Sequence, residues 1–466
     1  MCVSLAARLP ARDGIQPSES KSSHVTTRFR ALRHRNFQLF TAGQLVSLVG
    51  TWMQTTAQLW LVYRLTGSAA WLGLLAFANQ IPMLVLASVG GYIGDRYSRH
   101  RGVIATQTIS MLLAFLVAGL TLAQVVRVWH LVAITFLVGI VNAFDVPIRQ
   151  SFFVQMVGKE DLPNAIALNS SIFNGARVVG PAIAGFAISW VGEGWCFFLN
   201  GVSFLAVIFA LLAMKIPPQE RKESEESPFA SLVGGFRYAM YDRPIRSTLL
   251  LLSMLSLLGF QYAVFMPIFA QDILHSGARG LGLLMSAAGV GAVLGALHFA
   301  ARTHYHGLAR WIAAMSVVCS GGLIIFSQSR VFWLSCLVLF IVGFVATSQM
   351  AATNTTVQNR SPEQLRGRLM AVYATMFMGV QPIGALLAGV VAKRIGAPNT
   401  MAVFGGICLV GSLLFAAWVL LRVRPAAEAE PVGARSTGNE REVRAAELIE
   451  KQVGAVAETD GDHSIF

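Results

Sequence analysis

The chain has 466 residues, of which 55% are apolar and only 13% are charged. An average globular domain carries roughly a quarter charged residues, so this composition excludes most classes of soluble protein and excludes intrinsic disorder for the bulk of the chain. The net charge of +13 would suggest a nucleic-acid partner in a soluble protein, but its meaning depends on where the basic residues lie. The five cysteines lie far apart and form no CxxC pair, so we expect neither a disulfide framework nor a metal site.

Twelve segments of the chain are apolar over the length of a membrane-spanning helix, which needs about 20 residues to cross about 30 Å of hydrocarbon. They cover residues 37–63, 70–93, 102–124, 129–149, 164–190, 195–214, 246–270, 279–299, 309–327, 331–353, 369–392 and 400–421. We therefore predict an all-α membrane protein with twelve transmembrane helices. The first 35 residues are polar, so we expect no signal peptide. The Arg-rich run 28–35 indicates a basic anchor beside the membrane rather than an organellar presequence.

The distribution of Lys and Arg predicts the orientation in the membrane. If the N-terminus is cytoplasmic, the outer connections hold only Arg64, Arg127, Arg279, Arg330, Lys393 and Arg394. Cytoplasmic loops of membrane proteins carry an excess of Lys and Arg, so both termini are predicted to be cytoplasmic. The positive charge then indicates topology and contact with anionic membrane lipid, and we expect no nucleic-acid partner.

A charged, proline-bearing connection at residues 215–245 separates the first six segments from the last six. Phe229, Leu232, Val233, Phe236 and Met240 recur in it at helical spacing and predict a short amphipathic helix on the inner membrane face. The two halves share strings in the same order: SLVG at 47–50 and SLLG at 256–259, then LGLL at both 72–75 and 281–284. These repeats predict two six-helix bundles, at 36–214 and 246–422. A cytoplasmic N-terminal segment (1–35) precedes them, and a disordered cytoplasmic tail (423–466) follows.

The loop after the second segment combines glycine, one acidic residue and several basic residues. Basic residues are expected in any inner loop, but Gly91 also lets a neighbouring helix approach closely. Asp95 can accept a hydrogen bond from an arginine or face a helix N-terminus, a contact that one conformation makes and another breaks. Together with Arg96, Arg99 and Arg101 these residues form a candidate conformational latch.

This loop resembles the signature motif of the major facilitator superfamily, in which Gly, an apolar residue, Asp, Arg, Gly and two basic residues lie between helices 2 and 3. Gly91, Ile93, Asp95, Arg96 and Arg99 match the motif, whereas a serine replaces its second glycine and a histidine one basic residue. The resemblance implies a fold of two six-helix pseudo-repeats, a monomer, and a central cavity lined by helices 1, 4, 7 and 10.

Longer strings narrow the resemblance. GQLVSLVGTWMQ at 43–54, DLPNA at 161–165 and RGRLM at 366–370 look like the branch that contains the enterobactin exporter and macrolide-type efflux proteins. Gly180, Pro181 and Gly185 resemble the helix-5 motif of the superfamily's exporters, where a proline leaves a carbonyl unpaired and permits a bend; packing alone is the other explanation of Pro181. The resemblance implies a multi-pass transporter of the bacterial inner membrane.

Polar residues inside apolar segments are the strongest site candidates, since a charge at the membrane centre costs about 2.5 to 3.5 kcal/mol on insertion scales. Arg177 lies near the middle of the fifth segment, and Asn142, Asp145 and Arg149 share one face of the fourth. Asp145 is the single carboxylate within the predicted segments. Two interpretations stay open: a fixed ion pair of Asp145 with Arg149 or Arg177 that holds helices 4 and 5 together, or a group for proton coupling or gating.

Amides on the segments expected to line the cavity are the substrate-site candidates. They are Gln54 and Gln58 on the first segment, Asn142 on the fourth, Gln261 and Tyr262 on the seventh, and Gln349 and Asn354 on the tenth. Amides in membrane helices also hydrogen-bond neighbouring helices, so each is either a structural or a binding group. With 29 Phe in the chain and few charges, such a cavity suits a bulky, partly apolar small molecule.

We therefore predict a secondary active exporter of a drug- or siderophore-like molecule, working by alternating access and driven by proton antiport. The sequence contains no GxxxxGK[ST] phosphate loop, no nucleophile elbow and no HExxH, so we expect no ATP hydrolysis, no other enzyme activity and no cofactor. An importer of the same fold and a non-transporting membrane sensor or scaffold acting through its tail are the alternatives.

Overall fold

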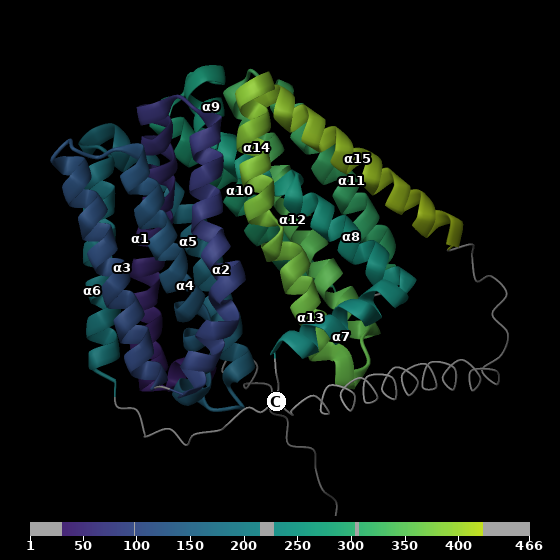
Figure 1. Cartoon of the computed structure of the whole chain (residues 1–466), viewed down its shortest axis with the longest axis horizontal. Coiled ribbons are helices and arrows are strands. Elements are labelled where there is room, and N and C mark those ends of the chain that lie inside the picture. Colours follow the sequence, from purple (N-terminus) through teal and green to yellow (C-terminus); the bar gives the residue numbers. More distant parts are fainter. Residues whose placement is uncertain (1–29, 97, 215–227, 303–306, 423–466) are drawn as a thin grey trace, which may run out of the picture. The chain divides into compact units, whose positions relative to one another are not determined.

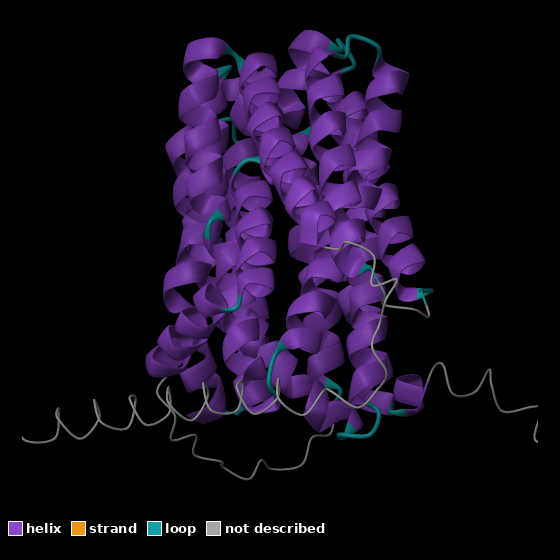
Figure 2. Ribbon diagram, turned by 90° about the vertical axis from the view of Figure 1, so that its right-hand side faces the viewer, coloured by secondary structure: helices purple, strands orange, loops and turns teal. Residues whose placement is uncertain are grey.

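The computed structural model describes residues 30–96, 98–214, 228–302 and 307–422, and for residues 87–96, 228–234 and 422 it describes the backbone alone. The described chain is helical and contains no strand (Figure 2). The predicted disordered tail (423–466), most of the predicted N-terminal segment (1–29) and the first part of the predicted linker (215–227) lie outside the described residues.

The helices fall into two halves joined by a short helix (Figure 1). The N-terminal half contains η1 (Arg30–Arg33), α1 (Arg35–Thr66), α2 (Ala69–Arg96), α3 (Arg99–Leu122), α4 (Val128–Val157), α5 (Leu162–Val191) and α6 (Glu193–Leu212). The joining helix is α7 (Pro228–Tyr241). The C-terminal half contains α8 (Arg243–Leu257), η2 (Gly259–Gln261), α9 (Tyr262–Ile268), η3 (Phe269–Ile273), α10 (Gly277–Ala300), α11 (Leu308–Gln328), α12 (Phe332–Arg360), η4 (Glu363–Leu365), α13 (Arg366–Ala374), η5 (Thr375–Gly379), α14 (Gln381–Ile395) and α15 (Ala397–Arg422).

Within the described residues, 11 helical segments are long and apolar enough to cross a membrane. Each overlaps one of the predicted segments. The remaining predicted segment, 37–63, forms the continuous 32-residue helix α1, which is not among the 11. Its many Gln, Ser and Thr side chains lower its mean hydropathy, and several of them line a cavity.

Two of the spanning segments are interrupted helices. Residues Arg243–Ile273 run through α8, η2, α9 and η3, and residues Glu363–Ile395 run through η4, α13, η5 and α14. The turns η3 and η5 are π-helical, a geometry that is rare and occurs frequently at functional sites. Pro267 precedes the first of these turns and Pro382 follows the second, and proline cannot donate the backbone hydrogen bond of a regular helix.

The N-terminal half is held together by apolar packing and a few polar contacts between helices. Helix α1 packs against α5 and α6, α3 packs against α4 and α6, and α2 packs against α4. Asn200 of α6 donates a 2.7 Å hydrogen bond to the Gln54 side chain of α1, and the His100 ring of α3 contacts the Leu211 carbonyl of α6 at 2.8 Å. Such bonds between helices satisfy polar groups that would otherwise face hydrocarbon.

In the C-terminal half, α12 packs against α10 and α11, and glycines allow a close approach. A Cβ atom added at Gly343 of α12 would collide with the Ala288 carbonyl of α10. Helix α7, which covers the predicted amphipathic run, lies against α13 (Figure 1). Its place at the inner membrane face stays a prediction.

The two halves meet mainly through two helix pairs, α2 with α14 and α5 with α10. Each pair has glycine at its contact: a Cβ atom added at Gly73 would lie 2.5 Å from the Ala385 carbonyl oxygen, and one at Gly185 would lie 2.8 Å from that of Ala278. Because small residues let helix backbones approach closely, these pairs pack more tightly than larger side chains would permit.

These contacts lie toward one end of the helices, where α1, α5, η3 and α14 finish at Thr66, Val191, Ile273 and Ile395; we call it the closed end. There, one cluster of buried apolar residues extends across both halves, including Leu72, Ile188, Leu281 and Ala388. Toward the opposite end the buried residues form separate clusters, one around Phe40 and Phe152 in the N-terminal half and one around Ile245 and Leu369 in the C-terminal half. The apolar core therefore joins the halves at the closed end and divides toward the other.

Candidate functional site

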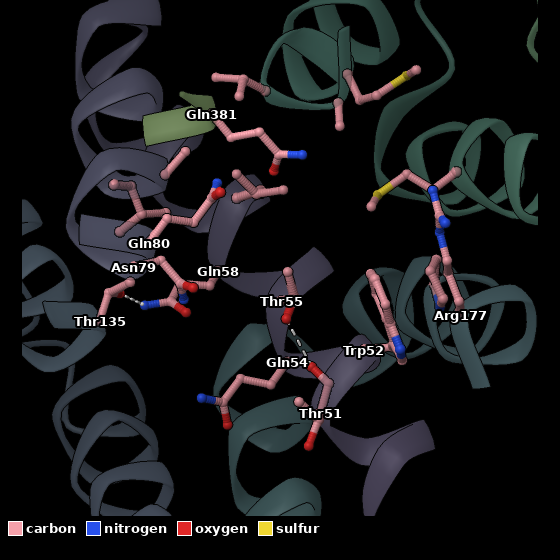
Figure 3. A pocket seen from close by; sticks show the side chains of 18 of the residues that line it. Thr51, Trp52, Gln54, Thr55, Gln58, Asn79, Gln80, Thr135, Arg177 and Gln381 are labelled. Atoms are coloured by element: carbon pink, nitrogen blue, oxygen red, sulfur yellow. Dashed lines mark hydrogen bonds between the residues drawn. The ribbon is translucent and has the colours of Figure 1, made fainter. Parts of the chain in front are cut away.

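A cavity of about 540 Å³ lies between the two halves. Its walls come from α1, α2, α4 and α5 of the N-terminal half and from η2, α9, α10 and α14 of the C-terminal half. Its polar lining consists of Thr51, Gln54, Thr55, Gln58, Asn79, Gln80, Thr135, Asn142, Arg177, Gln261, Tyr262 and Gln381 (Figure 3). Aromatic and sulfur-containing side chains fill much of the rest, namely Trp52, Phe173, Phe260, Met266 and Met285. The volume is in the range of cavities that bind small molecules.

The cavity brings together five of the seven residues predicted for a substrate site, namely Gln54, Gln58, Asn142, Gln261 and Tyr262. Arg177, which is predicted for proton coupling or gating, and Pro181 of the helix-5 motif also line it. Gln349 and Asn354 of α12 are not in its lining. Gln349 is 1% exposed and donates to Thr353 at 3.2 Å, and Asn354 accepts from Gln358 at 2.6 Å. Both of these hydrogen bonds lie within α12 itself.

The lining amides also bond to protein groups around the cavity. Gln58 donates to the Thr135 hydroxyl of α4 at 2.5 Å (Figure 3). Gln261 is buried and donates to the Ser256 carbonyl at 3.0 Å and to the Gln381 carbonyl at 3.4 Å, bridging the break between α8 and α9 to α14. Both interpretations of these amides are therefore supported by the geometry: each borders the cavity and each also connects helices.

Arg177 is the one residue among those lining the cavity that carries a formal charge. Its guanidinium lies 5.9 Å from the centre of the Trp52 ring, and its charge acts on the nearby Tyr262 side chain across the boundary between the halves. A cation over the face of a tryptophan ring is attracted by the ring's electron density. Arg177 and Trp52 lie on one side of the cavity, and Gln58, Asn79 and Gln80 lie on the other (Figure 3).

Asp145 does not line the cavity but lies in a buried network between α3 and α4. Its carboxylate accepts hydrogen bonds from Thr106 at 2.6 Å and from Gln107 at 3.0 Å, and its other oxygen lies 3.2 Å from the Arg149 guanidinium. Of the two arginines proposed as its partner, the structure therefore pairs it with Arg149. The network joins α3 to α4 rather than α4 to α5. Its proton-coupling or gating role stays a prediction.

The candidate latch lies at the end of α2 and the start of α3. Gly91, Asp95 and Arg96 lie in the last turns of α2, and their side chains are outside the described residues. Arg99 donates to the Ser151 carbonyl of α4 at 3.3 Å, and Arg101 is exposed. The latch lies at the end of α2 away from the closed end.

The glycine and proline motif of α5 lies in a continuous helix that contacts both halves. A Cβ atom added at Gly180 would lie 2.5 Å from the Trp52 Cβ of α1, while Gly185 faces α10. On α10, Ser286 donates to the Val178 carbonyl of α5 at 2.7 Å. This stretch of α5 therefore serves as a packing surface for α1 and for α10, and whether it bends during a transport cycle stays a prediction.

Sequence reasoning missed several polar residues, among them Asn79, Gln80 and Asp272. Asn79 and Gln80 line the cavity from α2, and the signal that identified the other amides, a polar side chain within an apolar run, applies to them as well. Asp272 lies in the π-helical turn η3, inside the spanning segment Arg243–Ile273, and accepts a hydrogen bond from the Tyr63 hydroxyl of α1. The predicted segment stopped at residue 270, so Asp145 is not the single carboxylate within a span.

Comparison with known proteins identifies the family. The chain matches the family model described as transmembrane secretion effector over residues 26–457. The staphyloferrin A transporter of Staphylococcus aureus is 25% identical over 372 residues, covering 78% of this chain and 92% of that protein. The multidrug efflux pump Tap of Mycolicibacterium fortuitum is 26% identical over 375 residues, covering 77% and 88%. The enterobactin exporter EntS of Escherichia coli is 26% identical over 399 residues, covering 84% and 93%.

Solved structures support the fold. The nucleoside transporter NupG superposes with a TM-score of 0.64 at 14% identity, covering 82% of this chain and 99% of NupG. A bacterial homologue of the human lysosomal transporter Spinster, in an inward-facing and occupied conformation, superposes with a TM-score of 0.66 at 13% identity, covering 86% and 99%. At such identities the likeness concerns the fold alone. Because the family model covers most of the sequence, the chain belongs to the transmembrane secretion effector family of the major facilitator superfamily and is a multi-pass membrane transporter, not an enzyme.

Proposed function

We propose that the protein exports a bulky, partly apolar small molecule, of drug or siderophore type, by alternating access driven by proton antiport. The observation that carries the proposal is the cavity of about 540 Å³, lined by both halves and by amides and aromatic rings. Its size and mixed lining suit a molecule that combines apolar rings with several hydrogen-bonding groups. A siderophore transporter, a siderophore exporter and a multidrug efflux pump are among the relatives, which supports the same substrate class.

The proposed arrangement is twelve transmembrane helices in two six-helix bundles, 36–214 and 246–422, in the bacterial inner membrane as a monomer. Both termini are cytoplasmic in this topology, which agrees with the scarcity of Lys and Arg in the connections on the opposite side. The closed end then faces outward, and the described conformation has its cavity shut toward the outside. The basic inner face contacts anionic lipid.

Alternating access requires the contacts at the closed end to break while others form at the opposite end. The pairs α2 with α14 and α5 with α10 supply surfaces for that rocking motion, because glycines let their backbones approach closely. The candidate latch of Gly91, Asp95, Arg96, Arg99 and Arg101 lies at the end where new contacts would form. Protons are taken up at Asp145 in this proposal, since it is a buried carboxylate and its neutralisation would release the ion pair that it forms with Arg149.

The test is accumulation of fluorescent dyes, macrolides and siderophores in cells with and without the protein, before and after a protonophore collapses the proton gradient. We expect lower accumulation with the protein and restored accumulation after the gradient collapses. Thr55→Trp fills the cavity and should abolish the effect, whereas Leu116→Trp adds the same ring at an exposed position of α3 outside the cavity and should not. Higher accumulation with the protein would indicate import, and equal accumulation of every compound would contradict transport of this substrate class.

A further inference from the structure

The cavity has an unbalanced charge. Among the described residues that line it, Arg177 is the single formally charged one, and none of the others is Asp, Glu, Lys or His. None of the ion pairs formed by the described residues involves Arg177. The buried carboxylate Asp145 is already paired with Arg149 and hydrogen-bonded by Thr106 and Gln107. Within the described protein, the positive charge of Arg177 therefore has no neutralising partner.

Arg177 lies near the middle of the 30-residue helix α5, where an uncompensated charge in a membrane protein is costly and marks a pathway for substrates or ions. The groups around it lower that cost but do not remove the charge. The Trp52 ring provides a cation–π contact at 5.9 Å, and the neutral Tyr262 side chain lies close by. A guanidinium held against an aromatic ring still offers its other N–H groups to a planar anion.

The surroundings of Arg177 define the rest of the ligand. Phe173 packs edge-on against Trp52 at 5.6 Å between ring centres, so aromatic surface adjoins the cation. The amides of Gln58, Asn79 and Gln80 face the cavity from the other side (Figure 3). An elongated molecule with an anionic group and an apolar body at one end and neutral polar groups at the other would satisfy both sides.

We propose that the cavity selects amphipathic organic anions, whose carboxylate pairs with Arg177 beside Trp52 while their neutral polar groups bond to the amides of α1 and α2. This deepens the proposed export function and rests on it. The position of Arg177 in α5 also supports the proposal. Its carbonyl lies close to Gly289 of α10, and the carbonyl of the next residue, Val178, accepts the hydrogen bond from Ser286 of α10. An anion bound to Arg177 would thus lie beside the α5–α10 contact between the halves.

The test uses three probes with the same aromatic body: 4-(1-pyrenyl)butyrate, its methyl ester and 4-(1-pyrenyl)butylamine, which is cationic. Each is titrated onto the full-length protein in nanodiscs of uncharged phosphatidylcholine, with binding measured by energy transfer from tryptophan to pyrene and corrected with empty nanodiscs. We expect the butyrate to bind at least about tenfold more tightly than the ester, as one charge-assisted hydrogen bond allows. The amine should bind more weakly still.

Variants assign the preference to Arg177. Arg177→Gln should bind butyrate and ester equally, Arg177→Lys should keep part of the preference, and the control Arg330→Gln, which removes an exposed arginine outside the cavity, should behave as the wild type. Where Arg177→Gln does not fold, a salt titration of the wild type replaces it, and added salt should weaken binding of the butyrate but not of the ester. A preference that persists in Arg177→Gln, equal affinities in the wild type, or no saturable binding of butyrate would each overturn the proposal.

Failure of the anion-site proposal can be distinguished experimentally from failure of the export proposal. Gradient-dependent efflux of neutral or cationic dyes, without an anion preference that depends on Arg177, would leave export standing and remove the anion site. No gradient-dependent efflux of any compound, together with an intact butyrate preference in nanodiscs, would remove export and leave the anion site.

Discussion

The Tyr63 hydroxyl of α1 donates a hydrogen bond to the Asp272 carboxylate in the π-helical turn η3, and this bond joins the two halves at the closed end. The neighbouring Arg64 pairs with Glu193 at 2.8 Å, but that ion pair connects α1 to α6 within the N-terminal half. Two adjacent residues of α1 therefore make different kinds of contact. Tyr63 connects the two halves at the closed end, and Arg64 stabilises the N-terminal half.

Tyr63→Phe should therefore shift the protein away from the described conformation. A hydrogen bond to a carboxylate contributes about 1 to 2 kcal/mol, reduced here because Asp272 is exposed, so we expect a population shift of about fivefold. Spin labels at Leu65 and Lys393, on a cysteine-free background, should report longer distances between the halves by double electron–electron resonance. Glu193→Gln is the control, because it breaks an ion pair within one half and should leave the distances unchanged. Identical distributions in Tyr63→Phe and the wild type would show that the bond does not hold the closed end.

Gly73→Ala should also shift the protein away from the described conformation, in this case by a steric clash between helices. The added Cβ would lie 2.5 Å from the Ala385 carbonyl oxygen, a backbone atom that cannot rotate away, so α2 and α14 must separate. Overpacking of this kind typically costs about 1 to 3 kcal/mol. We expect a smaller closed population in the same spin-label measurement. Gly175→Ala adds the same methyl group to α5 in open space and should change nothing; a closed population equal to the wild type in Gly73→Ala would contradict the packing argument.

Asp145→Asn should abolish uphill export while leaving downhill exchange intact. The substitution keeps a side chain that can bond to Thr106 but removes the charge that takes up a proton and pairs with Arg149. The measurement compares transport in proteoliposomes with and without a pH gradient. Thr106→Val retains the carboxylate and its arginine, so uphill export should persist there. If uphill export also survives Asp145→Asn, the contacts of Asp145 with Thr106, Gln107 and Arg149 are structural. Their loss should then lower the thermal stability of the protein instead.

Gln80→Leu and Gln349→Leu should have different effects on transport and on stability, although both remove an amide from a spanning helix. Gln80 lines the cavity, so its loss should raise the KM of a transported dye by about two- to tenfold, as expected for one hydrogen bond. Gln349 is buried outside the cavity lining and hydrogen-bonds within its own helix, so its replacement should alter the unfolding temperature rather than the KM. Uptake kinetics and thermal unfolding on both variants check this, and a larger KM change in Gln349→Leu would place the substrate site nearer α12.

Much of the site could be predicted from residue type and position. Gln58 and Arg177 are polar residues in long apolar runs, and because such residues are costly in hydrocarbon they face the protein interior or a cavity. The same reasoning applies to Asp145, yet the structure places it in a network between α3 and α4. Helical spacing shows that Asp145 and Arg149 share a face but not which helix that face meets.

The sequence by itself determined that the chain is a helical membrane protein, because the hydrophobic length of each segment is a local property. Only the tertiary structure decided that Tyr63 meets Asp272, that Arg177 lies beside Trp52 rather than Asp145, and that α12 contributes no residue to the cavity lining. Such pairings depend on how far each helix is rotated and shifted against its neighbours. That geometry is set by close packing at glycines such as Gly73 and Gly185 together with their partners on the other half.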